Sequence, residues 1–280
     1  MQRHSFEHRG FKLSYLDSAP QDNDRPVVLM LHGFPDHALM WAGQFEALQG
    51  AGFRVLAPDT LGCGESEIAP QVSDYDRNLV VSDFVALLDH LGIPRAKVVG
   101  HDWGAVLAWL MAVNHADRVQ QLIAVSVGHP TAYARSGLKQ KLMGWYTLFF
   151  QLRRIPERVL MSNGPLSLRK LIPLHPEIDE VMQRMRAPGR FTAALNLYRA
   201  NILGMLLTKL DKTAVPTVGI WSDKDAYLTE SQMLGSRKYL QGEWSYERLS
   251  GGHWIPLEQP QVLNKLLLKY LEPDAQPARM

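Results

Sequence analysis

Val98-Val99-Gly100-His101-Asp102-Trp103-Gly104-Ala105 is the stretch that decides the fold of this chain of 280 residues. A short apolar run leads to an acidic residue between small residues, and the apolar periodicity of a helix follows. This pattern predicts a sharp strand-to-helix turn that lifts the side chain of Asp102 above the end of a sheet. A carboxylate is already ionised at neutral pH, so Asp102 can act as a nucleophile without an activating base. The alternative interpretation is an ordinary helix N-cap.

Length and composition fit one large α/β domain with room for an inserted subdomain. Hydrophobic residues make up 46% of the chain, which is enough for a sizeable core. The 30 basic and 28 acidic residues are spread along the chain, so we expect no nucleic acid partner. The single cysteine, Cys63, cannot form an internal disulfide and receives no role. Together with a polar N-terminus that lacks a secretory signal, it predicts a cytoplasmic protein.

Two further classes of site are not expected from the sequence. No apolar run approaches the roughly 20 residues that a membrane span needs. No CxxC pair, HExxH or EF-hand pattern occurs, so a metal ion is not implied.

Strands and helices alternate along the first part of the chain, which is typical of a parallel sheet. Residues 11–16 and 27–31 are expected to form a strand pair. From about residue 131 the chain is helix-like, rich in Arg, Met and aromatic residues, and repeatedly interrupted by proline. The predicted division is a core in residues 1–129, an inserted helical cap in 130–213, and a second core part in 214–280. The further expected elements are strands 53–58, 119–127, 215–221 and 244–249, with helices 41–50, 78–91, 105–116 and 262–271.

Candidate catalytic residues follow several of the predicted strands. His32-Gly33-Phe34-Pro35 forces a turn that leaves the amide of Phe34 free to point inward, beside the amide of Trp103 after the elbow. These amides are candidate oxyanion donors, although a plain turn is the other interpretation. Ser222-Asp223-Lys224-Asp225 supplies carboxylates just past a strand end, and Gly251-Gly252-His253 lifts a histidine over the sheet edge.

Two tyrosines of the helical region are of interest. Tyr146 lies within Trp145-Tyr146-Thr147-Leu148-Phe149-Phe150-Gln151, and Tyr198 lies within Leu195-Asn196-Leu197-Tyr198-Arg199-Ala200. A phenol whose hydroxyl faces a cavity can donate a hydrogen bond to a leaving oxygen. Spacing alone leaves simple core packing as the alternative for both.

These motifs together resemble those of the soluble epoxide hydrolases of the α/β-hydrolase superfamily. The turn at Phe34, the aspartate elbow and the Gly251-Gly252-His253-Trp254 loop carry the resemblance, in the chain order of nucleophile, acid and histidine. It implies a mostly parallel eight-stranded sheet, a helical cap and no cofactor. It also implies that Asp225 rather than Asp223 is the acid that orients His253, because Asp225 follows the lysine and precedes Ala-Tyr-Leu.

The resemblance also implies a reaction. Asp102 would attack an apolar or aromatic epoxide while Tyr146 and Tyr198 bind the ring oxygen, and His253 would activate the water that hydrolyses the resulting ester to a vicinal diol. The oxyanion donors would be the amides of Phe34 and Trp103. The expected partners are therefore the epoxide and water, in a monomer or homodimer. The side chains expected to contact the substrate are Trp103, Phe34, Trp145, Phe149 and Trp254.

Three other functions are compared with this one on the sequence. A haloalkane dehalogenase would share the aspartate elbow and the histidine, and Trp145 could then supply a halide contact beside Trp103. A fluoroacetate dehalogenase fits less well, because Trp103 and Val106 stand where an arginine pair is expected. A ligand-binding protein without turnover would have no need of nucleophile, acid and base together.

Overall fold

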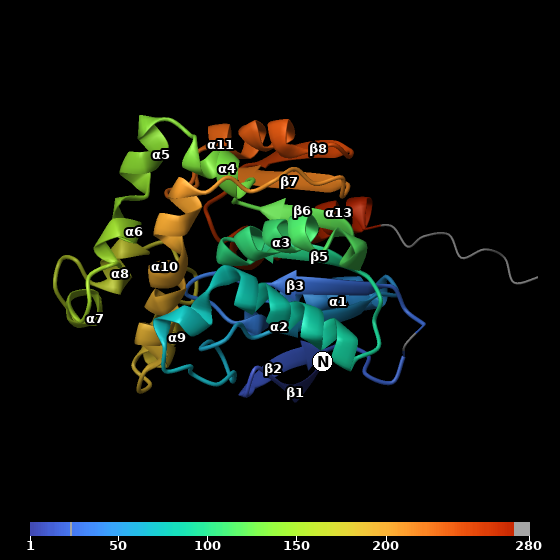
Figure 1. Ribbon diagram of the computed structural model, residues 1–280, viewed down its shortest axis with the longest axis horizontal. Coiled ribbons are helices and arrows are strands. Elements are labelled where there is room, and N and C mark those ends of the chain that lie inside the picture. Colours follow the sequence, from blue (N-terminus) through green and yellow to red (C-terminus); the bar gives the residue numbers. More distant parts are fainter. Residues whose placement is uncertain (23, 272–280) are drawn as a thin grey trace, which may run out of the picture.

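A computed structural model describes residues 1–22 and 24–271, and its centre is a twisted sheet (Figure 1). Eight strands of the described residues form this sheet in the order β1-β2-β4-β3-β5-β6-β7-β8. Pairs from β4 to β8 are parallel, and β1–β2 and β2–β4 are antiparallel. The strands are β1 (Gln2–His8), β2 (Phe11–Asp17), β3 (Val27–Leu31), β4 (Arg54–Pro58), β5 (Ala96–His101), β6 (Val119–Val125), β7 (Thr217–Ser222) and β8 (Trp244–Leu249). The mostly parallel eight-stranded sheet is thereby confirmed.

Helices cover both faces of the sheet, which explains why every residue of β3, β4 and β5 is buried. Leu29 and Leu31 join the apolar cluster under α2 and α3, whereas Val28 and Met30 join the cluster under α1 and α13. This alternation follows from the period of two in a strand. The core helices are α1 (Ala42–Gly50), α2 (Arg77–His90), α3 (Trp103–Asn114), α11 (Glu230–Gly235), α12 (Ile255–Glu258) and α13 (Pro260–Tyr270), with the 3₁₀ helices η1 (Ala38–Trp41), η2 (Val72–Tyr75), η3 (Ala116–Arg118) and η4 (Ser236–Tyr239).

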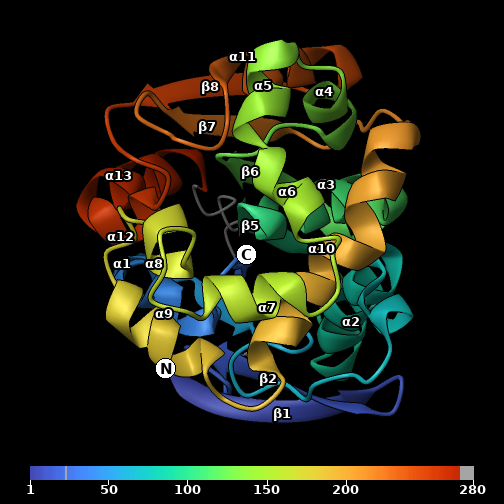
Figure 2. The same ribbon diagram turned by 90° about the vertical axis from the view of Figure 1, so that its left-hand side faces the viewer.

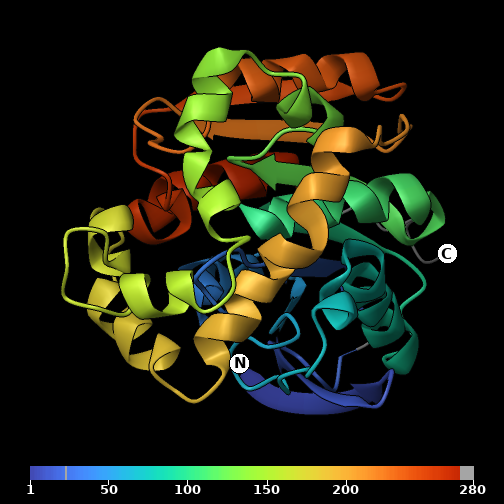
Figure 3. The same cartoon turned by 60° about the vertical axis from the view of Figure 1, so that its left-hand side comes forward.

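Between β6 and β7 the chain forms seven helices that lie across the carboxyl ends of the strands (Figures 2 and 3). We use the name cap for residues 130–213, the predicted boundaries. The helices of the cap are α4 (Pro130–Ala134), α5 (Leu138–Met143), α6 (Trp145–Phe149), α7 (Ile155–Leu160), α8 (Leu168–Leu171), α9 (Ile178–Met185) and α10 (Arg190–Leu207). None of the helices in the described ranges has both the length and the apolar character that crossing a bilayer requires.

Buried polar contacts fix the cap on the core. The side chain of Asn201 on α10 accepts a hydrogen bond from the amide of Arg77 at 2.8 Å and donates one to the carbonyl of Tyr75 at 2.8 Å. On the other side of the cap, Nε2 of His175 lies 3.1 Å from Oδ1 of Asp36, and both side chains are buried. Since Asp36 follows the Phe34 turn, this contact links the cap directly to a loop of the site.

The expected pairing of the first two strands is wrong. The strand β2 pairs with β1 on one side and with β4 on the other, while β3 lies between β4 and β5. The strand β1 was not expected, because its sequence is largely polar and Phe6 is the one buried residue in it. Such a strand carries little apolar signal, since it sits at the edge of the sheet and half of its surroundings are solvent.

One buried ion pair tests how the sheet is held together. Arg54 on β4 contacts Asp17 on β2 at 2.6 Å, and both side chains are at most 2% exposed. Replacing Arg54 by Met leaves a buried carboxylate without its counter-ion, which should lower the free energy of unfolding by about 3–5 kcal/mol. Urea denaturation of the variant measures this loss.

The matched control for this variant is Arg169→Met, which removes the exposed pair with Asp179. It should change the free energy of unfolding by less than about 1 kcal/mol. The double variant Arg54→Met with Asp17→Leu should recover most of the lost stability, because no charge is then buried alone. Equal losses for the Arg54 and Arg169 variants would contradict the assigned role of the buried pair.

Candidate active site

The elbow brings Asp102 to the top of the sheet between β5 and α3. Its backbone has φ of +53° and ψ of −121°, a conformation that a residue with a Cβ rarely adopts. A Cβ on Gly100 would collide with the backbone of Gly104, and a Cβ on Gly104 would collide with the backbone of Leu31. The small residues are therefore required by the close approach of β3, β5 and α3. Within the described helix α3, the Asp102 side chain makes no capping hydrogen bond of the N-cap kind.

Two backbone amides bond the Asp102 carboxylate. The amide of Phe34 donates a hydrogen bond to Oδ1 at 2.8 Å, and the amide of Trp103 also donates to the carboxylate. Burial is the largest influence on this group and raises the pKa of Asp102, against the opposing effects of His253 and the two amides. Gly33 allows the close approach, because a Cβ there would overlap the Asp102 side chain. The hydrogen bond from the Phe34 amide leaves the other oxygen, Oδ2, available to other groups.

His253 faces that second oxygen. Its Nε2 lies 3.8 Å from Oδ2 of Asp102, and its Nδ1 lies 2.8 Å from Oδ2 of Asp225. Since the carboxylate of Asp225 accepts, Nδ1 carries the proton and Nε2 of the neutral ring can take one up. Burial by itself lowers the pKa of His253, but the charges of Asp225 and then of Asp102 outweigh it, so that this pKa lies above its ordinary value.

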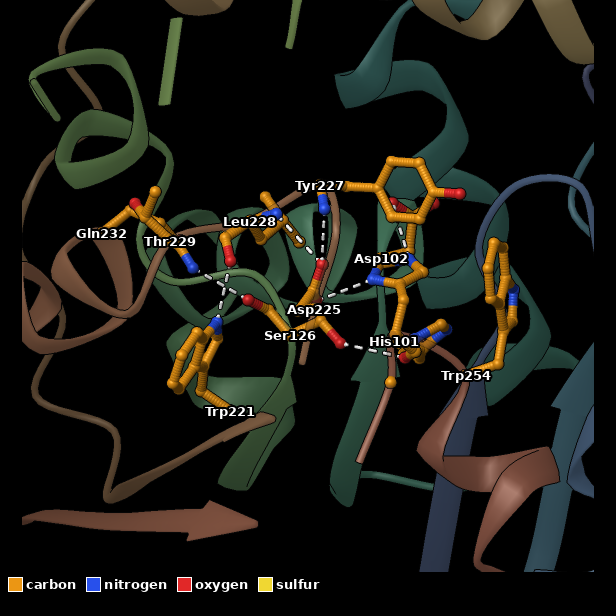
Figure 4. Close-up of polar contacts among 12 residues, drawn as sticks. His101, Asp102, Ser126, Trp221, Asp225, Tyr227, Leu228, Thr229, Gln232 and Trp254 are labelled. Atoms are coloured by element: carbon orange, nitrogen blue, oxygen red, sulfur yellow. Dashed lines mark hydrogen bonds and ion pairs between the residues drawn. The ribbon is translucent and has the colours of Figure 1, made fainter. Parts of the chain in front are cut away.

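Asp225 is fixed by its own turn after β7. Its Oδ1 accepts hydrogen bonds from the amides of Tyr227 at 2.8 Å and Leu228 at 3.0 Å (Figure 4). The neighbouring Asp223 is exposed and instead accepts from the amide of Gly251 at 3.2 Å. Of the two carboxylates in this stretch, Asp225 is therefore the one that touches the histidine.

Asp102, Tyr146 and Tyr198 together line two adjoining cavities. We call the cavity that also contacts Trp103 and Val106 the α10-side cavity, and the one that also contacts His253 the histidine-side cavity. The rings of Tyr146 and Tyr198 are 6.4 Å apart, and Tyr198 packs edge-on against Trp103 at 5.1 Å. Burial, reinforced by the negative charge of Asp102, raises the pKa of both phenols well above the ordinary value. Both phenols are therefore protonated hydrogen-bond donors at neutral pH.

The expected substrate contacts divide into two groups. Trp103 lines the α10-side cavity, and Phe34 and Trp254 line the histidine-side cavity. Trp145 is half exposed and Phe149 packs against Trp145 and Phe150, and neither belongs to the described residues that line the two cavities. The expected contact of Trp145 and Phe149 with the substrate stays a prediction. A helix turns by about 100° per residue, so Trp145 points in a different direction from Tyr146, and its half-exposed side chain faces solvent.

Three residues of the site received no role from the sequence. His101 is buried and donates from Nε2 to the carbonyl of His253 at 2.8 Å, and burial lowers its pKa to about 3, so it stays neutral. Tyr133 lines the α10-side cavity, where burial raises its pKa to about 12. Tyr227 stands 5.1 Å from the His253 ring and donates to the carbonyl of Leu171 at 3.0 Å. The available signal was their position, directly beside a motif or at the start of the cap.

Within residues 1–22 and 24–271, no three side chains of His, Cys, Asp or Glu converge in a way that could hold a metal ion. The site consists of carboxylates, an imidazole, phenols and backbone amides.

Comparison with known proteins identifies the family. A family model described as alpha/beta hydrolase fold matches residues 26–164. Epoxide hydrolase 3 of Xenopus tropicalis is 31% identical over 95% of this chain and 76% of that protein. Epoxide hydrolase A of Mycobacterium tuberculosis is 31% identical over 88% of this chain and 90% of that protein. The crystal structure of epoxide hydrolase A from Mycobacterium thermoresistibile superposes with a TM-score of 0.80, at 26% identity, over 96% of this chain and 98% of that one. The chain therefore belongs to the epoxide hydrolase family of the α/β-hydrolase superfamily.

Proposed function

We propose that this protein is an enzyme that hydrolyses apolar epoxides to vicinal diols through a covalent ester on Asp102. The observation that carries the proposal is the meeting of a carboxylate with two protonated phenols at the same cavities, where Asp102, Tyr146 and Tyr198 all contribute to the walls. A nucleophile opposite two proton donors is what opening a strained ether ring requires.

In the first half of the reaction, Oδ2 of Asp102 attacks one carbon of the epoxide. The carbon–oxygen bond of the ring breaks, and the electron pair stays on the ring oxygen. Tyr146 and Tyr198 donate hydrogen bonds to this oxygen, and one of them transfers its proton as the alkoxide develops. The product of this half is an alkyl ester of Asp102 that carries a free hydroxyl group.

In the second half, water hydrolyses the ester. Nε2 of His253 removes a proton from a water molecule, and the oxygen of that water attacks the ester carbonyl of Asp102. The amides of Phe34 and Trp103, which bond the carboxylate in the resting state, stabilise the negative oxygen of the intermediate. As the intermediate collapses, the carbon–oxygen bond of the ester breaks, the second proton of the water passes to the leaving oxygen, and the diol departs. The proton on His253 then restores the phenol, and Asp102 is again a carboxylate. The overall balance is one epoxide and one water to one diol.

The position of Trp145 argues against the haloalkane dehalogenase alternative. It requires N–H donors that surround a halide, with Trp145 as the second contact beside Trp103. Trp145 is half exposed and stands outside both cavities, and Phe34 has no side-chain donor. The phenols instead favour an oxygen leaving group. The aromatic walls of the cavities also support an apolar substrate.

Isotope labelling tests the covalent step. In a single turnover of styrene oxide in water enriched in oxygen-18, the first diol should contain the unlabelled oxygen of Asp102, because the enzyme carboxylate supplies it. The heavy oxygen should then appear in the peptide that contains Asp102, as measured by mass spectrometry. Asp102→Ala should lower kcat by roughly 10⁴-fold or more. Immediate labelling of the first diol would exclude the ester.

Removing the phenol hydroxyls tests the donors. Tyr146→Phe and Tyr198→Phe should each slow ring opening by about 10²-fold, and the double variant should slow it further, because the ring oxygen then develops charge without a donor. Stopped-flow measurement of single-turnover ring opening reports this rate. The matched control is Tyr270→Phe on α13, where the hydroxyl bonds Glu247 outside the site. A double variant that opens epoxides at the rate of the control refutes the role of the phenols.

Substitution of the base should separate the two halves of the reaction. In His253→Gln the ester should form but persist, because the water that hydrolyses it is no longer activated. Intact-protein mass spectrometry should find the enzyme heavier by one substrate molecule. The exposed His90→Gln is the matched control and should turn over normally.

The pH dependence of kcat follows from the same group. Only neutral His253 can accept a proton, and its pKa lies above the ordinary 6.5. In the ester the charge of Asp102 is gone, but Asp225 still acts to raise the pKa of His253. The rate of ester hydrolysis should therefore fall as the pH drops through the pKa that His253 has in the ester, and it should be retained above it. A rate that stays constant from pH 8 down to about pH 5, or a His253→Gln variant that forms no ester, contradicts the assigned base.

A further inference from the structure

Large apolar side chains are exposed along one face of the cap. Leu138 is 70% exposed, Leu142 is 64% exposed and Trp145 is 50% exposed. Leu148 and Leu152 continue the series at the spacing of three or four residues that marks one face of a helical segment. This outward face is distinct from the inward face that carries Tyr146.

The end of α10 extends the same surface. Leu203, Leu206 and Leu207 are exposed there, and Leu206 lines a cavity of about 280 Å³ together with Leu148 of α6 and Lys141 of α5. Figures 2 and 3 show α5, α6 and the last turns of α10 on the same forward side of the molecule. We call this surface the outer cap face; its apolar members are Leu138, Leu142, Trp145, Leu148, Leu206 and Leu207. Large apolar side chains that are exposed together on one side of a protein mark an interaction site.

Positive charge is concentrated in the cap as well. Residues 130–213 contain 14 Lys or Arg and 5 Asp or Glu, a net formal charge of +9. The remaining residues contain 16 basic and 23 acidic side chains, a net formal charge of −7. On the outer cap face itself, Lys139, Lys141 and Lys209 are exposed, and none forms an ion pair with another described residue. The surface therefore combines leucines, a tryptophan and unneutralised cations.

We propose that the outer cap face docks on the surface of a membrane that contains anionic lipids. Interfacial segments combine an apolar face that enters the headgroup region with Lys or Arg that attract anionic lipids. The cores of protein–protein interfaces, in contrast, are depleted in lysine. The exposed tryptophan among the leucines fits the membrane interface, where aromatic rings are enriched.

The cavity lined by Leu206, Leu148 and Lys141, which we call the outer cavity, suggests why docking would serve the enzyme. Tyr133 and Thr147 line both the outer cavity and the α10-side cavity that contains Asp102. The two cavities therefore adjoin at Tyr133 and Thr147, and we infer that an apolar epoxide from the bilayer enters the site past these two side chains. This route rests on the proposed epoxide hydrolase function, whereas the docking itself does not.

Vesicle flotation tests the docking without any substrate. The full chain should float with vesicles of phosphatidylcholine and phosphatidylglycerol, bind less to phosphatidylcholine alone, and dissociate at high salt, because salt screens the attraction. Leu138→Ser with Leu142→Ser should weaken the partition constant by about tenfold or more for each side chain that inserts. Lys139→Glu with Lys209→Glu should weaken binding to the anionic vesicles but not to vesicles of phosphatidylcholine.

Matched variants on α13, far from the cap, serve as controls. Leu268→Ser and Lys265→Glu alter an exposed leucine and an exposed lysine there and should leave flotation unchanged. Circular dichroism and hydrolysis of a soluble epoxide should be the same for the leucine variants as for the parent chain, which separates loss of docking from loss of folding or activity.

Two outcomes overturn the proposal. Absence of flotation with anionic vesicles does so directly, as does flotation that the variants of the outer cap face do not reduce. Sedimentation that shows a dimer lost in Leu138→Ser with Leu142→Ser, without vesicle binding by the parent chain, assigns the surface to a second copy of this chain instead. A catalytically inactive protein that still floats leaves the docking intact and rejects only the proposed epoxide chemistry.

Discussion

The site depends on holding one negative charge, the carboxylate of Asp102, at a turn that shields it from water. The positive φ of Asp102 is a strained conformation that costs on the order of 1–3 kcal/mol. Burial adds a further cost, which is visible as the raised pKa of this group. Hydrogen bonds from the amides of Phe34 and Trp103 offset part of these two costs. An ordinary N-cap needs neither the strain nor the converging backbones, which supports the proposed role of Asp102 as the nucleophile.

The fold brings the remaining groups to that charge from separate parts of the chain. The amide of Phe34 follows β3, Asp225 follows β7, and His253 follows β8, and parallel strands place all of these ends at one edge of the sheet. The cap supplies the phenols from α6 and α10. The distance between phenols and carboxylate is therefore set by how the cap sits on the core, which gives the buried contacts of Asn201 and of His175 with Asp36 a functional meaning.

The sequence predicted the features that depend on the local chain. The elbow, the histidine loop and the central strands have glycines or unbroken apolar runs that report directly on backbone geometry and burial. It failed where the answer depended on a distant partner. The edge strand β1 is stabilised by pairing with β2. The outward direction of Trp145 depends on how α6 is rotated about its own axis against the core. Neither the partner nor the rotation is encoded in the residues nearby.

Under the proposed mechanism, the charge of Asp102 also affects both proton transfers, from a tyrosine to the alkoxide and from water to His253. While the carboxylate is negative, it raises the pKa of Tyr146 and Tyr198 and contributes to the raised pKa of His253. Formation of the ester removes that charge. The phenols then lose part of their resistance to giving up a proton, just as the alkoxide needs one, and the imidazole shifts toward the neutral form that can deprotonate water. A carboxylate nucleophile thus couples ring opening to the activation of both its donors and its base, because one bond changes the electrostatic field at all three.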